Sequence, residues 1–229
     1  MPGSNLLSVI MPAPQYHGCL DSVSMALPYC NTSLSHAVRA EDIISRINIT
    51  EKIGLLSPHD APNYCGCEAA PVPHIGLPGW RWLTEINTVI GGATCVSADR
   101  CPTTFVGPLG VAASFNRSLW WAKGDVLSTE LRVLNNLNSG ASALSAFGPN
   151  INLVKDPRYG RNSELPGEDP FLSGSYATSF VQGMQQLSGG QQKMLAYLKH
   201  YTAYSKEASR FTCESTPSHV YVRVIAFAA

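Results

Sequence analysis

Apolar residues return at helical spacing in four stretches of the chain. From His36 onward they recur three and four positions apart, which predicts an amphipathic helix, and Thr50-Glu51-Lys52 predicts the start of a second, shorter helix with Thr50 as its N-cap. A longer amphipathic helix is predicted over Phe115–Leu137 with Asn116 as its cap, and a fourth over Pro170–Leu187. The apolar positions of these helices, in chain order, are Val38, Ile43, Ile44 and Ile47; Ile53, Leu55 and Leu56; Leu119, Trp120, Ala122, Val126, Leu127, Leu131 and Leu134; and Phe171, Tyr176, Phe180, Val181 and Met184.

Short apolar runs alternate with the later helices and predict strands over Thr103–Val111, Ala141–Phe147 and Lys193–Leu198. A repeating order of strand, loop and helix predicts βαβ units and a parallel sheet, hence an α/β fold. Polar segments follow two of the strands, namely Phe147–Pro170 and Lys199-His200. Because ligands bind at the carboxyl ends of parallel strands, in open sheets and in barrels alike, we expect both segments on the functional face.

The segment Phe147–Pro170, FGPNINLVKDPRYGRNSELPGEDP, is predicted to be a long, shaped loop. Its prolines and glycines exclude a continuous helix, and its charges exclude a central strand. The whole chain is only 14% charged, yet charges gather here at Lys155, Asp156, Arg158, Arg161, Glu164, Glu168 and Asp169. Arginine forks and carboxylates can form either an internal salt-bridge network that shapes the loop or a ligand site. Asp169-Pro170 also has the pattern of a helix start, with Asp169 as the cap.

Two further positions carry candidate chemistry. Lys199-His200 ends an apolar strand, and a solvated surface pair is the alternative interpretation. Glu85 lies in the apolar stretch Trp80–Ile90, where a carboxylate is either exposed or held by a cation. A carboxylate among aromatic rings is also typical of sugar sites, which combine ring stacking with hydrogen bonds to hydroxyls.

Composition narrows the class of protein. The 229 residues suit one large domain or part of one, and a net charge of zero argues against nucleic acid or an acidic membrane as partner. No apolar run approaches the ~18 residues of a membrane span. Seven cysteines permit up to three disulfides, and Cys95 and Cys101 bracket a small loop that they could close. The sequons at Asn31, Asn48 and Asn116 are close to a chance number, and the N-terminus lacks the basic region of a signal peptide.

Metal and nucleotide sites are disfavoured. His59, Cys65, Cys67 and His74 do not have an established zinc spacing. The run Leu187-Ser188-Gly189-Gly190-Gln191 matches a signature of transporter-type ATPases, but the phosphate loop that those proteins need upstream is absent. A Gly-Gly turn after a helix explains the run.

A series of motifs, in order, resembles glycoside hydrolase family 3, and within it the β-xylosidase / α-arabinofuranosidase-like branch. Phe147–Pro170 resembles G-P-N-I-N-x-x-R-D-P-R-W-G-R-x-x-E-x-P-G-E-D-P, and Lys199–Tyr204 resembles K-H-F-T-A-Y. Shorter matches are Leu27–Asn31 with Leu34 (the N-terminal arm), Arg46–Leu56 (the first helix with T-x-E-K), Trp80–Glu85 (Y-x-W-W-S-E) and Pro102–Arg132 (P-T-S-F-P-G-P-I-G to E-x-R). The resemblance covers about residues 26–212.

The resemblance implies a (β/α)8 TIM-type barrel, of which this chain would hold about the first half. We therefore expect an extended N-terminal arm over residues 1–35, an incomplete barrel domain over 36–212 and a divergent tail over 213–229. In the full-length protein a C-terminal α/β sandwich domain would follow as a partner of the barrel.

The implied activity is retaining removal of terminal, non-reducing β-linked xylose or arabinose from xylo-oligosaccharides during cell-wall polysaccharide breakdown. The oligosaccharide is the expected partner, no metal or organic cofactor is implied, and an extracellular location is expected. By resemblance, the residues that bind hydroxyls of the terminal sugar are Glu85, Arg161, Lys199 and His200. The residues expected to brace the loop are Glu164, Glu168 and Asp169.

The chain departs from the family pattern in ways that bear on catalysis. Family members carry a nucleophilic Asp in an S-D-W/Y context well beyond the lysine-histidine pair, and this sequence contains no such motif. The family histidine of E-A-L-H-G is replaced by Thr88, while Tyr159 for Trp and Lys155 for Arg are mild changes. We therefore expect the sugar-binding half only, with no catalytic residue present. The alternative is a non-catalytic sugar-binding pseudoenzyme or an inert truncated fragment.

Overall fold

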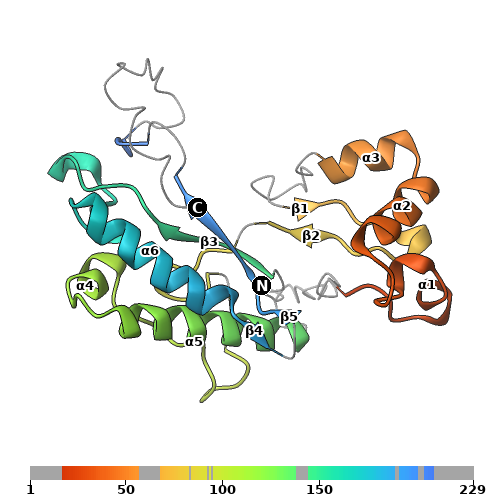
Figure 1. Ribbon diagram of the computed structural model, residues 1–229, viewed down its shortest axis with the longest axis horizontal. Helices are drawn as coiled ribbons and strands as arrows, with labels where there is room; N and C mark the ends of the chain where they lie inside the picture. The colour runs from red at the N-terminus through yellow and green to blue at the C-terminus, as the bar shows by residue number, and fades with distance from the viewer. Residues whose placement is uncertain are drawn as a thin grey trace, which may run out of the picture.

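The computed structural model describes residues 17–56, 68–82, 84–91, 93, 95–137, 144–188, 191–200 and 204–208. Helices α1 to α3 gather at one end of the molecule and α4 to α6 lie at the other, with β1 and β2 between them and β3 beside α6 (Figure 1). The elements, in order, are α1 (Ser22–Met25), η1 (Pro28–Cys30), α2 (His36–Arg46), α3 (Ile49–Leu56), β1 (Glu68–Ala69), η2 (Pro73–Ile75), β2 (Trp80–Arg81), α4 (Pro108–Ala112), α5 (Arg117–Asn136), β3 (Ser145–Asn150), η3 (Pro157–Tyr159), η4 (Asn162–Glu164), α6 (Pro170–Gln185), β4 (Leu187–Ser188), β5 (Gln191–Gln192) and β6 (Leu195–Lys199).

The N-terminal helices surround a small apolar cluster of their own. Ile47, Val72 and Ile75 are buried in it, and Leu27, Ile43, Leu55 and Leu77 pack against them. A disulfide joins Cys19 to Cys30, and the Tyr29 hydroxyl donates to the Ile75 carbonyl at 2.8 Å. The expectation of an extended arm is therefore wrong for residues 17–35, which hold α1 and η1. Asp21 begins α1 by accepting hydrogen bonds from the backbone N–H groups of Val23 and Ser24.

Helix starts follow the capping rules, with one correction. Asn116 caps α5 and Asp169 caps α6, both as predicted. The N-cap of α3 is Asn48 rather than Thr50: Asn48 Oδ1 accepts from Glu51 N at 3.0 Å, and Glu51 Oε2 accepts from Asn48 N at 2.9 Å. This reciprocal capping box satisfies two backbone donors at once, whereas Thr50 has Ile53 three positions on and therefore no carboxylate to complete the box.

Strands β3 and β6 pair in parallel, as the βαβ pattern predicted. Phe147 lies opposite Tyr197, and after a shift in register Asn150 lies opposite Lys199. On the other side of β3, Glu85 forms a parallel bridge with Phe147. Three parallel segments thus run side by side, and Glu85, Asn150 and Lys199 lie toward their carboxyl ends. Strand β3 continues to Asn150, three residues further than predicted, while residues 141–143 lie outside the described chain.

Helices α5 and α6 pack against each other and against the sheet, and together they form the main core. The buried residues are Ile86, Ile90, Val111, Ala112, Trp120, Leu127, Leu131, Leu134, Ala146, Tyr176, Phe180, Met184 and Met194. The helices approach closely through two glycines: a Cβ on Gly124 would collide with the Phe180 carbonyl, and one on Gly183 with the Trp121 carbonyl. Glycine is therefore required at this crossing for steric reasons.

Two predictions about these elements are wrong. Thr103–Val111 is no strand: residues 103–107 have no regular structure, and Pro108 begins α4. Proline suits the first helical position because its missing N–H needs no partner there. Phe171, placed on the apolar face of α6, is 75% exposed because it lies in the first turn, ahead of the part that packs on α5. In the described part of the chain no helix is long and apolar enough to cross a membrane.

Candidate functional site

The ion pair between Glu85 and Lys199 joins two of the three parallel segments. Lys199 Nζ lies 2.5 Å from Glu85 Oε1 and 2.6 Å from Oε2. The Lys199 side chain is only 10% exposed, whereas that of Glu85 is 47% exposed. The sequence left open whether Glu85 is exposed or held by a cation, and the structure shows that Lys199 holds it.

Arg161 lies at the N-terminal side of η4 and is fixed by Glu164. Arg161 Nε and Nη2 donate to the two carboxylate oxygens of Glu164, each at 2.5 Å. Asn150 Nδ2 donates to Glu164 Oε2 at 3.0 Å, so the end of β3 is tied to the loop. Asn87 donates in turn to Asn150 Oδ1 at 3.1 Å. These contacts fix both the guanidinium and the carboxylate in space.

Glu164 remains ionised in this setting. Burial alone would raise the pKa of its carboxyl group. The hydrogen bonds from Arg161, the positive charges of Arg161 and Lys199 and the hydrogen bond from Asn150 outweigh burial, and the net effect is a pKa below the ordinary value. A carboxylate held in this way can accept hydrogen bonds but cannot act as a proton donor near neutral pH.

His200 is oriented by Asn152. Asn152 Oδ1 accepts from His200 N at 2.7 Å and lies 3.1 Å from the ring atom Nδ1. The peptide bond between Lys199 and His200 is cis. The His200 ring meets the Tyr204 ring edge to face with centroids 4.4 Å apart. Asn152 therefore fixes both the backbone and the ring of His200.

Tyr204 connects His200 with Arg161. Arg161 Nη1 donates to the Tyr204 hydroxyl at 2.8 Å, and the guanidinium carbon lies 5.5 Å from the Tyr204 ring centroid. The Tyr204 hydroxyl also donates to Glu207, and Tyr159 meets the Tyr204 ring edge to face at 5.4 Å. Arg161 and His200, 39 positions apart by their numbers, therefore flank one aromatic ring.

The four predicted sugar-binding residues thus fall into two linked pairs, Glu85 with Lys199 and Arg161 with His200 through Tyr204. The Glu164 carboxylate, attracted by both Arg161 and Lys199, lies between the pairs. Their grouping follows from parallel strands ending at one edge, which the sequence predicted for the loop and for Lys199-His200 but not for Glu85. Their role as sugar ligands stays a prediction.

Sequence reasoning missed several polar residues of this network: Asn87, Asn150, Asn152, Tyr204 and Glu207. Asn150 and Asn152 had a signal, because amide side chains two positions apart after a strand share one face. The remaining three come from other segments and carry no such signal. Of the predicted bracing residues, Glu164 braces the loop and Asp169 caps α6.

The other charges of the loop form a separate, exposed pair. Arg158 donates to both carboxylate oxygens of Asp156, at 3.0 and 2.7 Å, and its side chain is 88% exposed. Hydrogen bonds from the Arg158 side chain and backbone hold the pKa of Asp156 down, at about 2. This pair shapes η3, so the loop contains one exposed ion pair and one part-buried ion pair, Arg161 with Glu164.

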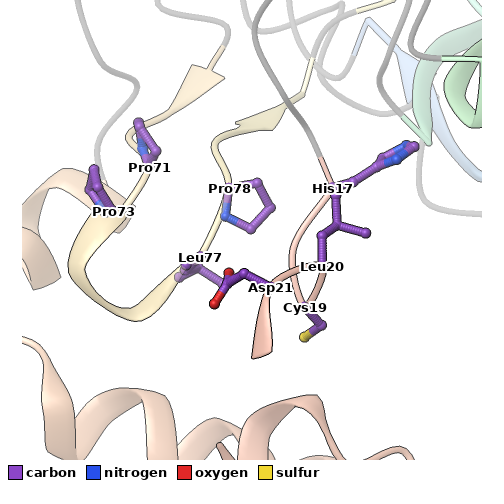
Figure 2. Close-up of a pocket in the computed structure, with 9 residues that line it drawn as sticks. His17, Cys19, Leu20, Asp21, Pro71, Pro73, Leu77 and Pro78 are labelled. Atoms are coloured by element: carbon purple, nitrogen blue, oxygen red, sulfur yellow. The ribbon is translucent and has the colours of Figure 1, made fainter. Parts of the chain in front are cut away.

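A surface pocket of about 540 Å³ lies in the N-terminal unit, apart from this network (Figure 2). It is lined by His17, Cys19, Leu20, Asp21, Pro71, Pro73, Gly76, Leu77 and Pro78. Its polar groups are already used: Asp21 caps α1, and His17 Nε2 lies 3.2 Å from Asn135 Oδ1 on α5. We assign no chemistry to this pocket.

Metal-binding geometry is not found among the described residues, where no three His, Cys, Asp or Glu side chains converge. His59, Cys65 and Cys67 lie outside the described chain. His74 Nδ1 lies 3.2 Å from Glu51, and its Nε2 lies 3.3 Å from the Arg46 carbonyl. The disulfide between Cys95 and Cys101, which the sequence left open, is present.

Comparison with known proteins identifies the class. The model of the glycosyl hydrolase family 3 N terminal domain matches residues 89–220. Beta-D-xylosidase 3 of Arabidopsis thaliana is 39% identical over 185 residues, which are 78% of this chain and 22% of that protein. Beta-xylosidase/alpha-L-arabinofuranosidase 1 of Medicago sativa subsp. varia is 38% identical over 201 residues, 83% of this chain and 24% of that protein.

A solved structure shares the fold. A family 3 exo-β-xylosidase in complex with a xylobiose aziridine probe superposes with a TM-score of 0.72 at 28% identity, over 85% of this chain and 25% of that one. The chain therefore belongs to glycosyl hydrolase family 3 and has the mixed helix and strand, open-sheet structure of its N-terminal domain. It spans about a quarter of the length of the curated relatives it matches.

Proposed function

We propose that this chain supplies the terminal-sugar site of a retaining β-xylosidase-type glycoside hydrolase, which removes β-linked xylose or arabinose from the non-reducing end of xylo-oligosaccharides. The observation that carries the proposal is the network of Glu85, Lys199, Arg161 and His200 around Tyr204 and Glu164. Arg161 and His200 flank the Tyr204 ring, and Glu85 and Lys199 add a fixed carboxylate and ammonium; an aromatic ring with such polar groups is the chemistry that neighbouring hydroxyls of a pyranose require. The names of the relatives, β-xylosidases and arabinofuranosidases, support this substrate class.

We further propose that the segment at Glu85, β3 and β6 are successive parallel strands of the first half of a (β/α)8 barrel. The parallel register and the cover of α5 and α6 support this topology. A C-terminal α/β sandwich domain would complete the full-length protein. The disulfides Cys19–Cys30 and Cys95–Cys101 support an extracellular location.

Binding without bond cleavage is the second candidate function, and the charge state of the site favours it for these residues. A retaining mechanism needs one carboxyl group that starts protonated and one that acts as nucleophile. The described network provides Glu164 with a lowered pKa and Glu85 in an ion pair with Lys199. The lowered pKa suits Glu164 to accepting hydrogen bonds from hydroxyls rather than to donating a proton, and Lys199 engages both carboxylate oxygens of Glu85.

Calorimetric titration of the full chain with xylose, arabinose and glucose tests the proposed site. Xylose or arabinose should bind with 1:1 stoichiometry and more tightly than glucose, whose extra hydroxymethyl group must be accommodated as well. Tighter binding of glucose would shift the substrate class to β-glucosides. No heat with any of the three sugars, from a chain shown to be folded by circular dichroism, would reject the sugar site.

A further inference from the structure

The sequon Asn31-Thr32-Ser33 is a chemical motif that the sugar site does not use. It lies in the loop between η1 and α2, and all three of its residues are exposed. Two other sequons, which begin at Asn48 and Asn116, are exposed as well. Exposure therefore does not separate the three, but the hydrogen bonds of their asparagine side chains do.

Asn31 folds back onto its own sequon in an Asx turn. Its Oδ1 accepts from Ser33 N at 3.0 Å and from Ser33 Oγ at 2.7 Å. The turn is closed by a hydrogen bond from Leu34 N to the Asn31 carbonyl at 3.2 Å. Both side-chain bonds connect residues two positions apart, so this conformation is available before the rest of the chain has folded.

A hydroxyl that donates to the carboxamide oxygen activates the carboxamide nitrogen. When Nδ2 loses a proton, negative charge develops on Oδ1, and a donor already placed against that oxygen stabilises the charge. Ser33 Oγ is such a donor for Asn31. The structure thus presents the third residue of the sequon in the position where its hydroxyl is chemically useful.

The other two sequons are committed to helix starts. Asn48 Oδ1 accepts from Glu51 N at 3.0 Å and begins α3, and Asn116 Oδ1 accepts from Leu119 N at 3.1 Å and begins α5. Their third residues, Thr50 and Ser118, lie in the first turns of these helices. Helical backbone there prevents the folded-back turn that Asn31 adopts.

We propose that Asn31 is an N-glycosylation site and that Asn48 and Asn116 remain unmodified. The donor is a lipid pyrophosphate-linked oligosaccharide. A bond forms between Nδ2 and the anomeric carbon, the bond from that carbon to the pyrophosphate oxygen breaks, Nδ2 loses a proton, and the lipid pyrophosphate leaves. The inference rests on the extracellular location proposed above, and the Cys19–Cys30 disulfide beside Asn31 fits the same oxidising compartment.

Glycan occupancy can be measured site by site, because the three sequons fall on three different tryptic peptides. These are the peptide that ends at Arg39, Ile47–Lys52 and Cys101–Arg117. The full chain is expressed in yeast behind a cleavable secretory leader, so that entry into the pathway does not depend on its native location. An amidase that converts glycosylated asparagine to aspartate then marks each occupied site for mass spectrometry. Conversion is expected only in the peptide that ends at Arg39.

Four variants test the role of the turn. Asn31→Gln and Ser33→Ala should abolish the modification, Ser33→Thr should retain it because the hydroxyl is kept, and Asn48→Gln should leave the glycoform unchanged. Conversion in Ile47–Lys52 or Cys101–Arg117, or an unmodified Asn31 in the secreted wild-type chain, would overturn the proposal. Sugar binding by unglycosylated chain from a bacterial host is measured separately, so failure here is distinguishable from failure of the proposed function.

Discussion

Lys199 Nζ lies 2.5 and 2.6 Å from the two carboxylate oxygens of Glu85, across 114 positions of sequence. The ammonium group is nearly buried while the carboxylate is half exposed. The pair therefore fixes the lysine at the end of β6 and leaves part of the carboxylate open to solvent or to a ligand.

We predict that Glu85 and Lys199 are energetically coupled. Glu85→Gln leaves a nearly buried ammonium without its counter-charge and should lower the free energy of unfolding by about 1–3 kcal/mol. Lys199→Met should lower the free energy of unfolding less in the Glu85→Gln background than in the wild type, because Glu85→Gln has already removed the ion pair. Urea unfolding of the two single variants and the double variant measures this coupling, and strictly additive losses would argue against the pair.

The lowered pKa of Glu164 predicts acid sensitivity of the loop. A carboxyl whose folded pKa is depressed stabilises the fold fully above its ordinary pKa of 4.5, and this contribution is lost as pH falls through the folded value. The contribution of Glu164 to stability should therefore be constant from neutral pH to about 4.5 and should fall below it. Glu164→Gln should flatten this decline. Glu168→Gln, a change of an exposed carboxylate on the same loop, should leave the profile unchanged.

Buried Lys123 predicts a rise of stability in mild alkali. Burial lowers its pKa to about 8, and it donates to the Val106 carbonyl at 3.1 Å. Between pH 8 and 10 the unfolded chain binds more protons at this residue than the folded chain does, so stability increases with pH. At about 1.4 kcal/mol per pH unit, the gain approaches 3 kcal/mol. Above pH 10 ionisation of the tyrosines opposes the gain, because burial raises the pKa of Tyr176.

Lys123→Met is the matched variant for that measurement. It removes the titrating group, so its unfolding free energy should not rise between pH 8 and 10. It should also exceed the wild type in stability at pH 7, because a buried charge is replaced by an apolar chain of similar length. If the unfolding free energy of the wild type did not rise between pH 8 and 10, and that of the variant ran parallel to it, the pKa of Lys123 would not be lowered by burial.

The crossing of α5 and α6 predicts a strong asymmetry between two glycines of one helix. Gly183→Ala brings a methyl group against the Trp121 carbonyl, so the helices must separate, at a cost of about 2–4 kcal/mol. Gly174→Ala meets nothing within 4 Å and should be neutral or stabilise by up to about 1 kcal/mol through helix propensity. Thermal melts of both variants measure the difference, and equal shifts in melting temperature would contradict this packing.

Local chemistry made several elements predictable from the sequence. Asn116 and Asp169 cap helices because their side chains need only partners within three residues, and the loop from Asp156 to Asp169 follows from its prolines and glycines. The strand predicted over Thr103–Val111 is wrong because an apolar run of that length also suits a strand, whereas Pro108 near its centre begins helix α4. An apolar run of this length distinguishes a strand from a helix start only when the prolines and glycines within it are considered together with the apolar positions.

The site was predictable in position but not in its contacts. Strand ends placed the loop and Lys199-His200 on one edge, since parallel strands share their carboxyl ends, whereas Glu85 was assigned by the family resemblance. The pairing of Arg161 with Glu164 and Tyr204 depends on the path of the loop through η3 and η4, which no periodicity encodes. The spacing of Asn150 and Asn152 marks both as candidates, but the contact of Asn152 with His200 depends on how β3 and β6 pair.

The binding contribution of Arg161 tests the central claim most directly, because the same loop offers a control. Calorimetric titration with methyl β-xyloside is compared among the wild type, Arg161→Lys and Arg158→Lys. Arg161→Lys should weaken binding at least tenfold, about 1.4 kcal/mol, since lysine cannot reproduce the forked contacts to Glu164 and Tyr204. Arg158→Lys, at an exposed pair, should change affinity by less than about twofold. Equal affinities in all three proteins would contradict a sugar site at Arg161.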